Sequence, residues 1–242
     1  MTALYDQIGD GYAGLRRPDP RIAARLAAAL GPAASLLNIG AGTGNYEPQD
    51  GRVVAVEPSR EMIRQRPQGA APAIQAVAAH LPFVDGAFEA ALAVLTVHHW
   101  PDPVAGLREL RRVTRGRIVI LTFDPGARPW LTDYLPELAA LDEAQMPALT
   151  DYAAALGSVR LEPLEIPHDC VDGFLYAYWR RPEAYLDPRL RSGSSSFRAL
   201  GDPLAGLERL RSDLESGAWE RRFAGLKGLD TYDAGYRIVI AG

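Results

Sequence analysis

The chain has 242 residues, of which 48% are hydrophobic and 23% charged, a composition that excludes disordered and collagen-like proteins. Its 26 basic and 30 acidic side chains give a formal net charge of −4, so an overall positive field for nucleic acid is absent. The single cysteine, Cys170, excludes a disulfide within the chain.

The N-terminal residues lack the basic and apolar regions of a signal peptide. The longest apolar stretch, 90–97, is far shorter than the about twenty residues that a membrane-spanning helix needs. We therefore expect a cytoplasmic protein with neither a membrane nor a nucleic-acid partner, present as a monomer or a homodimer.

Apolar runs alternate with helical patterns along the first half of the chain. Short runs rich in Val, Ile and Leu, closed by Gly, Pro or polar residues, are typical of strands buried on both faces. Ser59 and Asp102 are suitable N-cap residues for the helices that follow them. In chain order we expect a helix over 21–30, strands over 35–39 and 52–56, a helix beginning at Ser59, a strand over 88–97, a helix over 101–115 and a strand over 117–123.

Strands alternating with helices predict an α/β fold with a mostly parallel sheet, whose ligand lies at the carboxyl ends of the strands. In the second half, 159–166 is an expected strand interrupted by Pro163, and 236–241 is an expected terminal strand. The stretch between them, 168–230, is helical and aromatic in character. Because no linker of domain-separating length is visible, we expect a single domain over 1–242 with a helical insertion, or lid, over 168–230.

A glycine-rich loop follows the first expected strand, with glycines at 40, 42 and 44. The dinucleotide-binding pattern needs a third glycine where Asn45 stands, which argues against a nicotinamide oxidoreductase without excluding it. Glu57 ends the next strand and has two carboxylate oxygens for the hydroxyls of a ribose. The connection over 45–52 is too short for a full helix, so a cofactor without phosphate fits better than a dinucleotide.

Four segments in this order, LLNIGAGTGNY, VVAVEPSREMI, HLPFVDGAFEAALAVLTVHHW and LRELRRVTRGRIVILTFDP, resemble the class I S-adenosylmethionine-dependent methyltransferases. The resemblance is strongest to the methyltransferase type 11-like subgroup, which holds many small-molecule enzymes of bacterial metabolism. It implies a Rossmann-like doubly wound, mostly parallel sheet of seven strands. It also implies S-adenosyl-L-methionine as cofactor, S-adenosyl-L-homocysteine as product and a small-molecule acceptor methylated on O, N or C, in secondary metabolism.

The resemblance assigns cofactor contacts to matching positions of this sequence. The loop glycines and a lid formed by Tyr12 and Arg16 surround the methionine part, with Arg16 on its carboxylate, and Glu57 holds the ribose. The remaining contacts, to the adenine, the loop and the amino group, are assigned to Asn38, Gly40, Gly42, Gly44, Pro58, Met62, Ala78, Ala79 and the carbonyl of Leu95.

This sequence departs from the family at three places. Asn38 stands where the family has Asp or Glu, Val77 stands where it often has Asp, and the first crossover is short. These departures motivate an alternative, a protein that binds S-adenosylmethionine without transferring its methyl group. A further alternative, an RNA methyltransferase, is disfavoured because 96–100 lacks the Pro-Pro-aromatic turn of enzymes that methylate nucleic-acid amino groups.

His98 and His99 follow the fourth strand at the family's reaction centre, where a histidine with a near-neutral pKa suits a general base. In extended backbone neighbouring side chains point to opposite faces, so only one of the pair is expected to reach the acceptor. No metal is expected, because the pair diverges and no carboxylates cluster beside it. A helix over 174–181 would place two aromatic rings on one face, and the expected acceptor-binding residues are Trp100, Tyr134, Tyr176 and Trp179.

Overall fold

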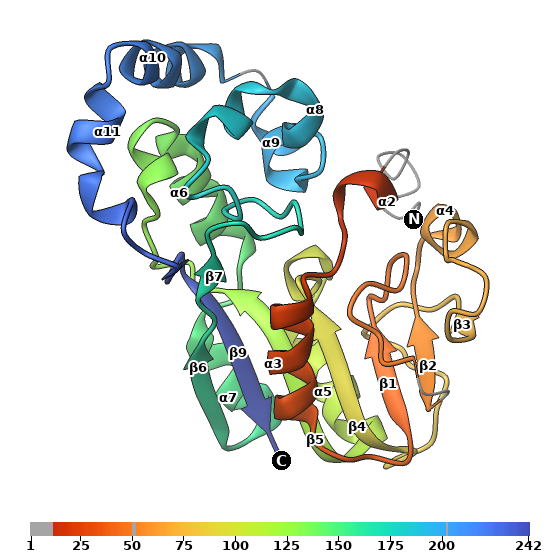
Figure 1. The fold of residues 1–242 in the computed structure, drawn as a ribbon. Helices are drawn as coiled ribbons and strands as arrows, with labels where there is room; N and C mark the ends of the chain where they lie inside the picture. Colours follow the sequence, from red (N-terminus) through yellow and green to blue (C-terminus); the bar gives the residue numbers. More distant parts are fainter. Residues whose placement is uncertain (1–11, 50–51, 202) are drawn as a thin grey trace.

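Seven strands form one sheet in the order β3-β2-β1-β4-β5-β9-β6 (Figure 1). The computed structural model describes residues 12–49, 52–201 and 203–242. Neighbours from β3 to β5 pair in parallel, whereas β9 is antiparallel to both β5 and β6. The expected mostly parallel, seven-stranded α/β sheet is therefore confirmed. The strands are β1 Leu36–Ile39, β2 Val53–Val56, β3 Ala73–Ile74, β4 Phe88–Val94, β5 Thr114–Phe123, β6 Val159–Pro163 and β9 Tyr236–Ala241.

Helices cover both faces of this sheet (Figure 1). Helix α3 (Pro20–Leu30) packs Ile22 and Leu26 into the core of one face. Helices α5 (Pro103–Val113) and α7 (Leu149–Leu156) pack on the other face. The expected N-cap is present, since Asp102 accepts a hydrogen bond from the Ala105 N–H at 2.9 Å. Burial on both sides explains why the central strands are almost wholly apolar.

The first crossover differs from the later ones because it contains no helix within residues 41–49 and 52. Turns fill it instead, as its length and Pro48 predict. The second crossover holds only the short helix α4 (Arg60–Arg64), and its Ser59 hydroxyl accepts from the Met62 N–H at 3.2 Å. Beyond the ends of β1 and β2 the chain therefore runs mainly in loops.

The expected helical insertion lies between β6 and β9, beyond the carboxyl ends of the parallel strands (Figure 1). A short antiparallel pair, β7 (Ile166–Pro167) with β8 (Thr231–Tyr232), closes its base. Helix α6 (Pro136–Gln145) packs beside it. Its own helices are α8 Pro188–Arg191, α9 Ser195–Leu200, α10 Leu204–Glu215 and α11 Ala218–Arg222, with 3₁₀ turns at Pro182–Leu186 and Ala224–Leu226.

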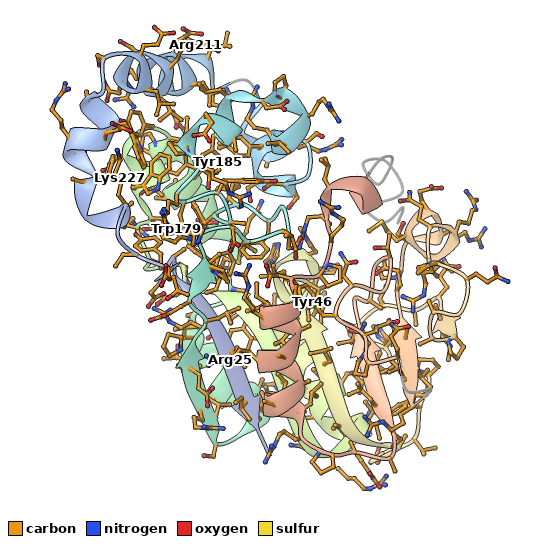
Figure 2. The ribbon with its side chains drawn as sticks, in the orientation of Figure 1. Arg25, Tyr46, Trp179, Tyr185, Arg211 and Lys227 are labelled. Carbon is orange, nitrogen blue, oxygen red and sulfur yellow. The ribbon has the colours of Figure 1, made fainter. Side chains whose placement is uncertain are left out.

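The expected helix over 174–181 is wrong, because this aromatic stretch forms consecutive turns. Its side chains point in different directions into the core, whereas one face of a helix would point them all the same way. Trp179 packs on Tyr232, whereas Tyr176 stacks on Phe123. Figure 2 shows Trp179 and Tyr185 within this part of the molecule. No helix in the described part of the chain is both long enough and apolar enough to cross a bilayer.

Candidate functional site

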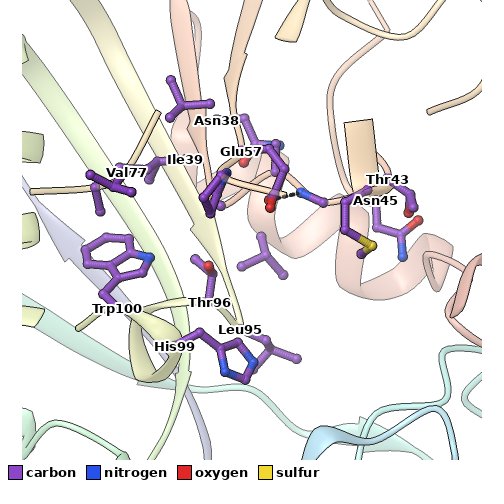
Figure 3. Close-up of a pocket in the computed structure, with 18 of the residues that line it drawn as sticks. Asn38, Ile39, Thr43, Asn45, Glu57, Val77, Leu95, Thr96, His99 and Trp100 are labelled. Atoms are coloured by element: carbon purple, nitrogen blue, oxygen red, sulfur yellow. Dashed lines mark hydrogen bonds between the residues drawn. The ribbon is translucent and has the colours of Figure 1, made fainter. Parts of the chain in front are cut away.

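A cleft with about 910 Å³ of space lies at the carboxyl ends of β1, β2 and β4 (Figure 3). We call it the strand-end cleft. Most of the residues assigned from the sequence come together there, because parallel strands end at one edge of the sheet. Of the assigned residues it is lined by Arg16, Asn38, Gly40, Gly42, Glu57, Pro58, Met62, Ala78, Leu95, His99 and Trp100.

The glycine loop owes its shape to sterics at Gly40. This residue has φ of +63°, and a Cβ built on it would lie 1.9 Å from Oγ1 of Thr96. Gly42 also has positive φ, at +52°. Gly44 and Ala79 lie outside the lining, so the structure does not bring these two assigned residues to the cleft. Gly44 instead faces the side chains of Glu47 and Arg66.

Glu57 is buried at the end of β2, with only 5% of its surface exposed. One carboxylate oxygen accepts from the Gly42 N–H and the other from the Ser59 N–H, each at 2.8 Å. A carboxylate oxygen has two lone pairs, so each can accept another hydrogen bond. The two backbone donors therefore fix the orientation of the carboxylate.

Asn38 belongs to a buried network of hydrogen bonds and an ion pair, which the sequence did not predict. Its Nδ2 donates to Oε1 of Glu47 at 2.9 Å, and the other oxygen of Glu47 pairs with Arg66 at 2.6 Å. Arg66 also donates to the Gly42 carbonyl at 3.2 Å. A negative charge thus lies beside Asn38, although Asn38 carries none itself. Only the presence of an acidic residue in so short a crossover could have hinted at this.

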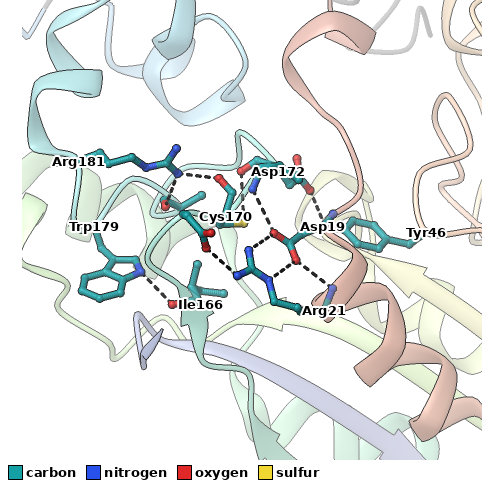
Figure 4. A network of polar contacts seen from close by, with 11 residues as sticks. Asp19, Arg21, Tyr46, Ile166, Cys170, Asp172, Trp179 and Arg181 are labelled. Carbon is teal, nitrogen blue, oxygen red and sulfur yellow. Dashed lines mark hydrogen bonds and ion pairs between the residues drawn. The ribbon is translucent and has the colours of Figure 1, made fainter. Parts of the chain in front are cut away.

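Arg16 and its partner Asp172, which Figure 4 labels beside Tyr46, connect three separate parts of the chain. Its Nε lies 2.6 Å from Oδ1 of Asp172, which is wholly buried within the helical insertion. Oδ2 of Asp172 accepts from the Tyr46 hydroxyl of the glycine loop at 2.8 Å. Tyr12 begins α2 (Tyr12–Leu15), but its side chain lies outside the described residues, so its assigned contact has no structural account.

The backbone is distorted just after β4, where Leu95 lines the strand-end cleft. Leu95 has φ of +48°, a left-handed conformation that costs a non-glycine residue about 1–3 kcal/mol. Such strain is found where a site depends on backbone direction. Here it directs the chain from β4 into a 3₁₀ turn, Val97–His99, whose His99 N–H donates to the Thr96 carbonyl at 2.9 Å.

This turn overturns two expectations about the histidines. The side chains do not point to opposite faces, because the backbone is not extended, and their ring centroids are 3.9 Å apart. Nor are their pKa values near neutral. Burial, with a contribution from Arg16, lowers the pKa of His99 to about 4 and that of His98 well below its usual value. Both imidazoles are therefore uncharged at neutral pH, and the same lowering makes each a weaker base than a histidine whose pKa is near neutral.

A second cavity, with about 460 Å³ of space, adjoins the cleft through Arg16, Leu95 and His99. We call it the aromatic pocket, because four buried rings line it. Its other lining groups include His98 and a buried carboxylate, Asp142. The rings are Phe123, Phe174, Tyr176 and Tyr236.

The four aromatic residues assigned to the acceptor are placed in different surroundings. Tyr176 lines the aromatic pocket, and Trp100 lines the strand-end cleft. Neither cavity includes Tyr134 or Trp179. The Tyr134 hydroxyl donates to Asp213 at 2.6 Å, and the Trp179 indole donates to the Ile166 carbonyl at 2.9 Å. These bonds satisfy their polar atoms within the core, away from both cavities.

Comparisons with known proteins place the chain among methyltransferases. The family model described as "Methyltransferase domain" matches residues 37–120. A protein of Anabaena variabilis, described as a methyltransferase from an antibiotic biosynthesis pathway, is 35% identical. The match covers 94% of this chain and 99% of that one, with a TM-score of 0.84.

A more distant solved structure is a geranyl diphosphate C-methyltransferase of Streptomyces coelicolor, in complex with S-adenosyl-L-homocysteine. It is 19% identical over 92% of this chain and 74% of its own, with a TM-score of 0.51, and so supports the fold alone. No protein of curated function matches the chain significantly.

Proposed function

The chain belongs to the class I S-adenosylmethionine-dependent methyltransferases, and on that premise we propose that it methylates an O, N or C atom of a small molecule. The observation that carries the proposal is that two cavities adjoin each other. The strand-end cleft suits the cofactor, and the aromatic pocket beside it suits an acceptor of small size. The residues shared by both cavities mark where the two molecules would meet.

The residues of the cleft fit S-adenosylmethionine. Glu57 offers two oriented oxygens to a ribose, and Met62, Val77 and Ala78 give an apolar wall for an adenine. Among the described lining residues Arg16 is the one side chain that carries a fixed positive charge, which suits a cofactor without phosphates. When bound, the cofactor supplies a methyl group that is already activated by attachment to a positively charged sulfur.

The chain's own contribution is then mainly positional. Walls that hold an acceptor in line with the transferable group and exclude water can contribute about 7–11 kcal/mol. The uncharged imidazoles of His98 and His99 can accept a hydrogen bond that orients the O–H or N–H group of an acceptor, and their lowered pKa values make them weak bases for its proton. His99 is the better placed of the two, because it lines both cavities.

The setting in secondary metabolism is part of the same proposal. Its support is the similar Anabaena protein, which is described as belonging to an antibiotic biosynthesis pathway. Acceptors of such pathways vary widely in shape, and the aromatic pocket is built largely by the insertion and α6 rather than by the common sheet.

Titration calorimetry with S-adenosylhomocysteine on the wild-type chain and on Glu57→Gln tests the cofactor site. We expect at least a roughly tenfold loss of affinity in the variant, because one ribose acceptor oxygen becomes a donor. The matched control is Asp124→Asn, which changes a carboxylate at the end of β5 that accepts from the Gly126 N–H at 2.9 Å but does not line the cleft.

The control variant should bind as the wild-type chain does, and thermal unfolding should show both variants folded. Absence of binding to the wild-type chain at millimolar ligand would overturn the proposed cofactor site. Equal affinities of Glu57→Gln and the wild-type chain would remove Glu57 from it.

A further inference from the structure

The aromatic pocket has walls that suit a flat or cationic group. Phe123 stacks on Tyr176 with ring centroids 5.0 Å apart, and Tyr236 meets Phe123 edge to face at 5.3 Å. Phe174 completes the wall at 4.8 Å from Tyr236. The faces of such rings carry partial negative charge and attract ammonium groups. The walls alone, however, do not separate a cation from a neutral aromatic acceptor.

A buried carboxylate in the same pocket makes that distinction. Asp142 is only 2% exposed, and its Oδ2 accepts from the Tyr176 hydroxyl at 2.7 Å. Among the described residues none donates to its other oxygen, and none forms an ion pair with it. Burial raises the pKa of Asp142 to about 6, so at pH 7.5 most molecules carry the charge. A buried charge without a cationic partner is costly, and a ligand cation would offset that cost.

The other groups of the pocket leave this charge unbalanced. Arg16, the cation at the opening to the cleft, is paired with Asp172. His98 and His99 are uncharged at this pH because their pKa values are lowered. Arg128, whose field acts weakly on Asp142, is bonded to Glu143 at the surface. The pocket therefore has an excess of negative charge on the α6 side.

We propose that Asp142 selects acceptors that carry a protonated amine, which it binds between the aromatic rings; the proposal rests on the proposed methyltransferase function. Asp142 lines the aromatic pocket but not the strand-end cleft. The anchored ammonium is thus distinct from the atom that is methylated. That atom lies toward Leu95 and His99, the residues shared by the two cavities.

Titration calorimetry at pH 7.5 with 2-phenylethylammonium and its neutral analogue 2-phenylethanol tests the proposal. We expect the wild-type chain, loaded with S-adenosylhomocysteine, to bind the ammonium at least about tenfold more tightly. In Asp142→Asn this preference should fall to within about threefold, with the affinity for the alcohol unchanged. The matched control is Asp213→Asn, which alters the similar Tyr134–Asp213 pair outside the pocket and should keep the full preference.

Two further measurements distinguish a role of Asp142 in ligand selection from a role in the stability of the fold. Thermal unfolding of Asp142→Asn should occur at or above the wild-type midpoint, because an unpaired buried charge is removed. Tyr176→Phe keeps the ring and the carboxylate but removes a hydrogen bond that favours the ionised form of Asp142, so it should weaken the preference for the ammonium without abolishing it. Equal binding of the two probes by the wild-type chain, or an equal loss of both in Asp142→Asn, would overturn the proposal.

The titrations are repeated without S-adenosylhomocysteine. Failure of that ligand to bind would count against the proposed function, whereas the comparison of ammonium with alcohol on the unloaded chain would still decide the role of Asp142.

Discussion

The glycine loop has no room for a side chain at Gly40. The Thr96 side chain fills the space where a Cβ would stand, and φ is +63°. We expect Gly40→Ala to lower the free energy of unfolding by about 3 kcal/mol or more, because a clash adds to the cost of left-handed backbone. Urea denaturation followed by circular dichroism measures the change.

Gly69→Ala is the matched control for this substitution. Gly69 also has positive φ, at +88°, but a Cβ there would meet nothing within 4 Å. It should cost only about 1 kcal/mol, from the backbone conformation alone. Similar losses in the two variants would show that Thr96 gives way and that the contact does not restrict Gly40.

The sequence predicted those structural features that depend on residues close together in the chain. The Asp102 cap, the missing helix of the first crossover and the position of Glu57 depend on residues close in sequence. The partners of Arg16 and Asn38 could not be found in that way. Asp172 is 156 residues from Arg16, and Glu47 lies in an irregular loop. The histidine pair was misjudged because a 3₁₀ turn replaces extended backbone after Leu95.

At the scale of elements, Asp172 connects the helical insertion to the segment before α3 through Arg16. It also connects the insertion to the glycine loop through Tyr46 (Figure 4). We expect Asp172→Asn to reduce the free energy of unfolding by about 3 kcal/mol, because it removes the negative charge that lies 2.6 Å from Arg16, whose side chain is only 10% exposed. Weaker binding of S-adenosylhomocysteine should accompany this loss. Denaturation and calorimetry on the same sample measure both effects.

Asp85→Asn provides the comparison, since it removes a partner of Arg112 whose side chain is 83% exposed. Exposed ion pairs contribute little, so the expected change is below about 0.5 kcal/mol. A variant at Asp172 that was as stable as the one at Asp85 would mean that the buried network does not hold the three segments together.

At the scale of the molecule, one apolar core runs from the sheet into the insertion. It contains Leu26 of α3 and Val119 of β5 at the sheet, and Trp179 and Trp219 in the insertion. We therefore expect urea to unfold both parts in one transition, with tryptophan fluorescence and circular dichroism giving the same midpoint. Saturation with S-adenosylhomocysteine should raise both midpoints together. Two separate midpoints would indicate that the insertion unfolds by itself.

The position of β9 has a consequence for synthesis on the ribosome. This strand pairs with both β5 and β6, yet it is made after every other described strand. Roughly 110 residues separate the end of β5 from the start of β9, which at about 5–20 residues per second is on the order of ten seconds of translation. During that time β5 presents an unpaired edge that can associate with other nascent chains. We expect α6 and the insertion to shield that edge as they emerge, until β9 is made and pairs with β5.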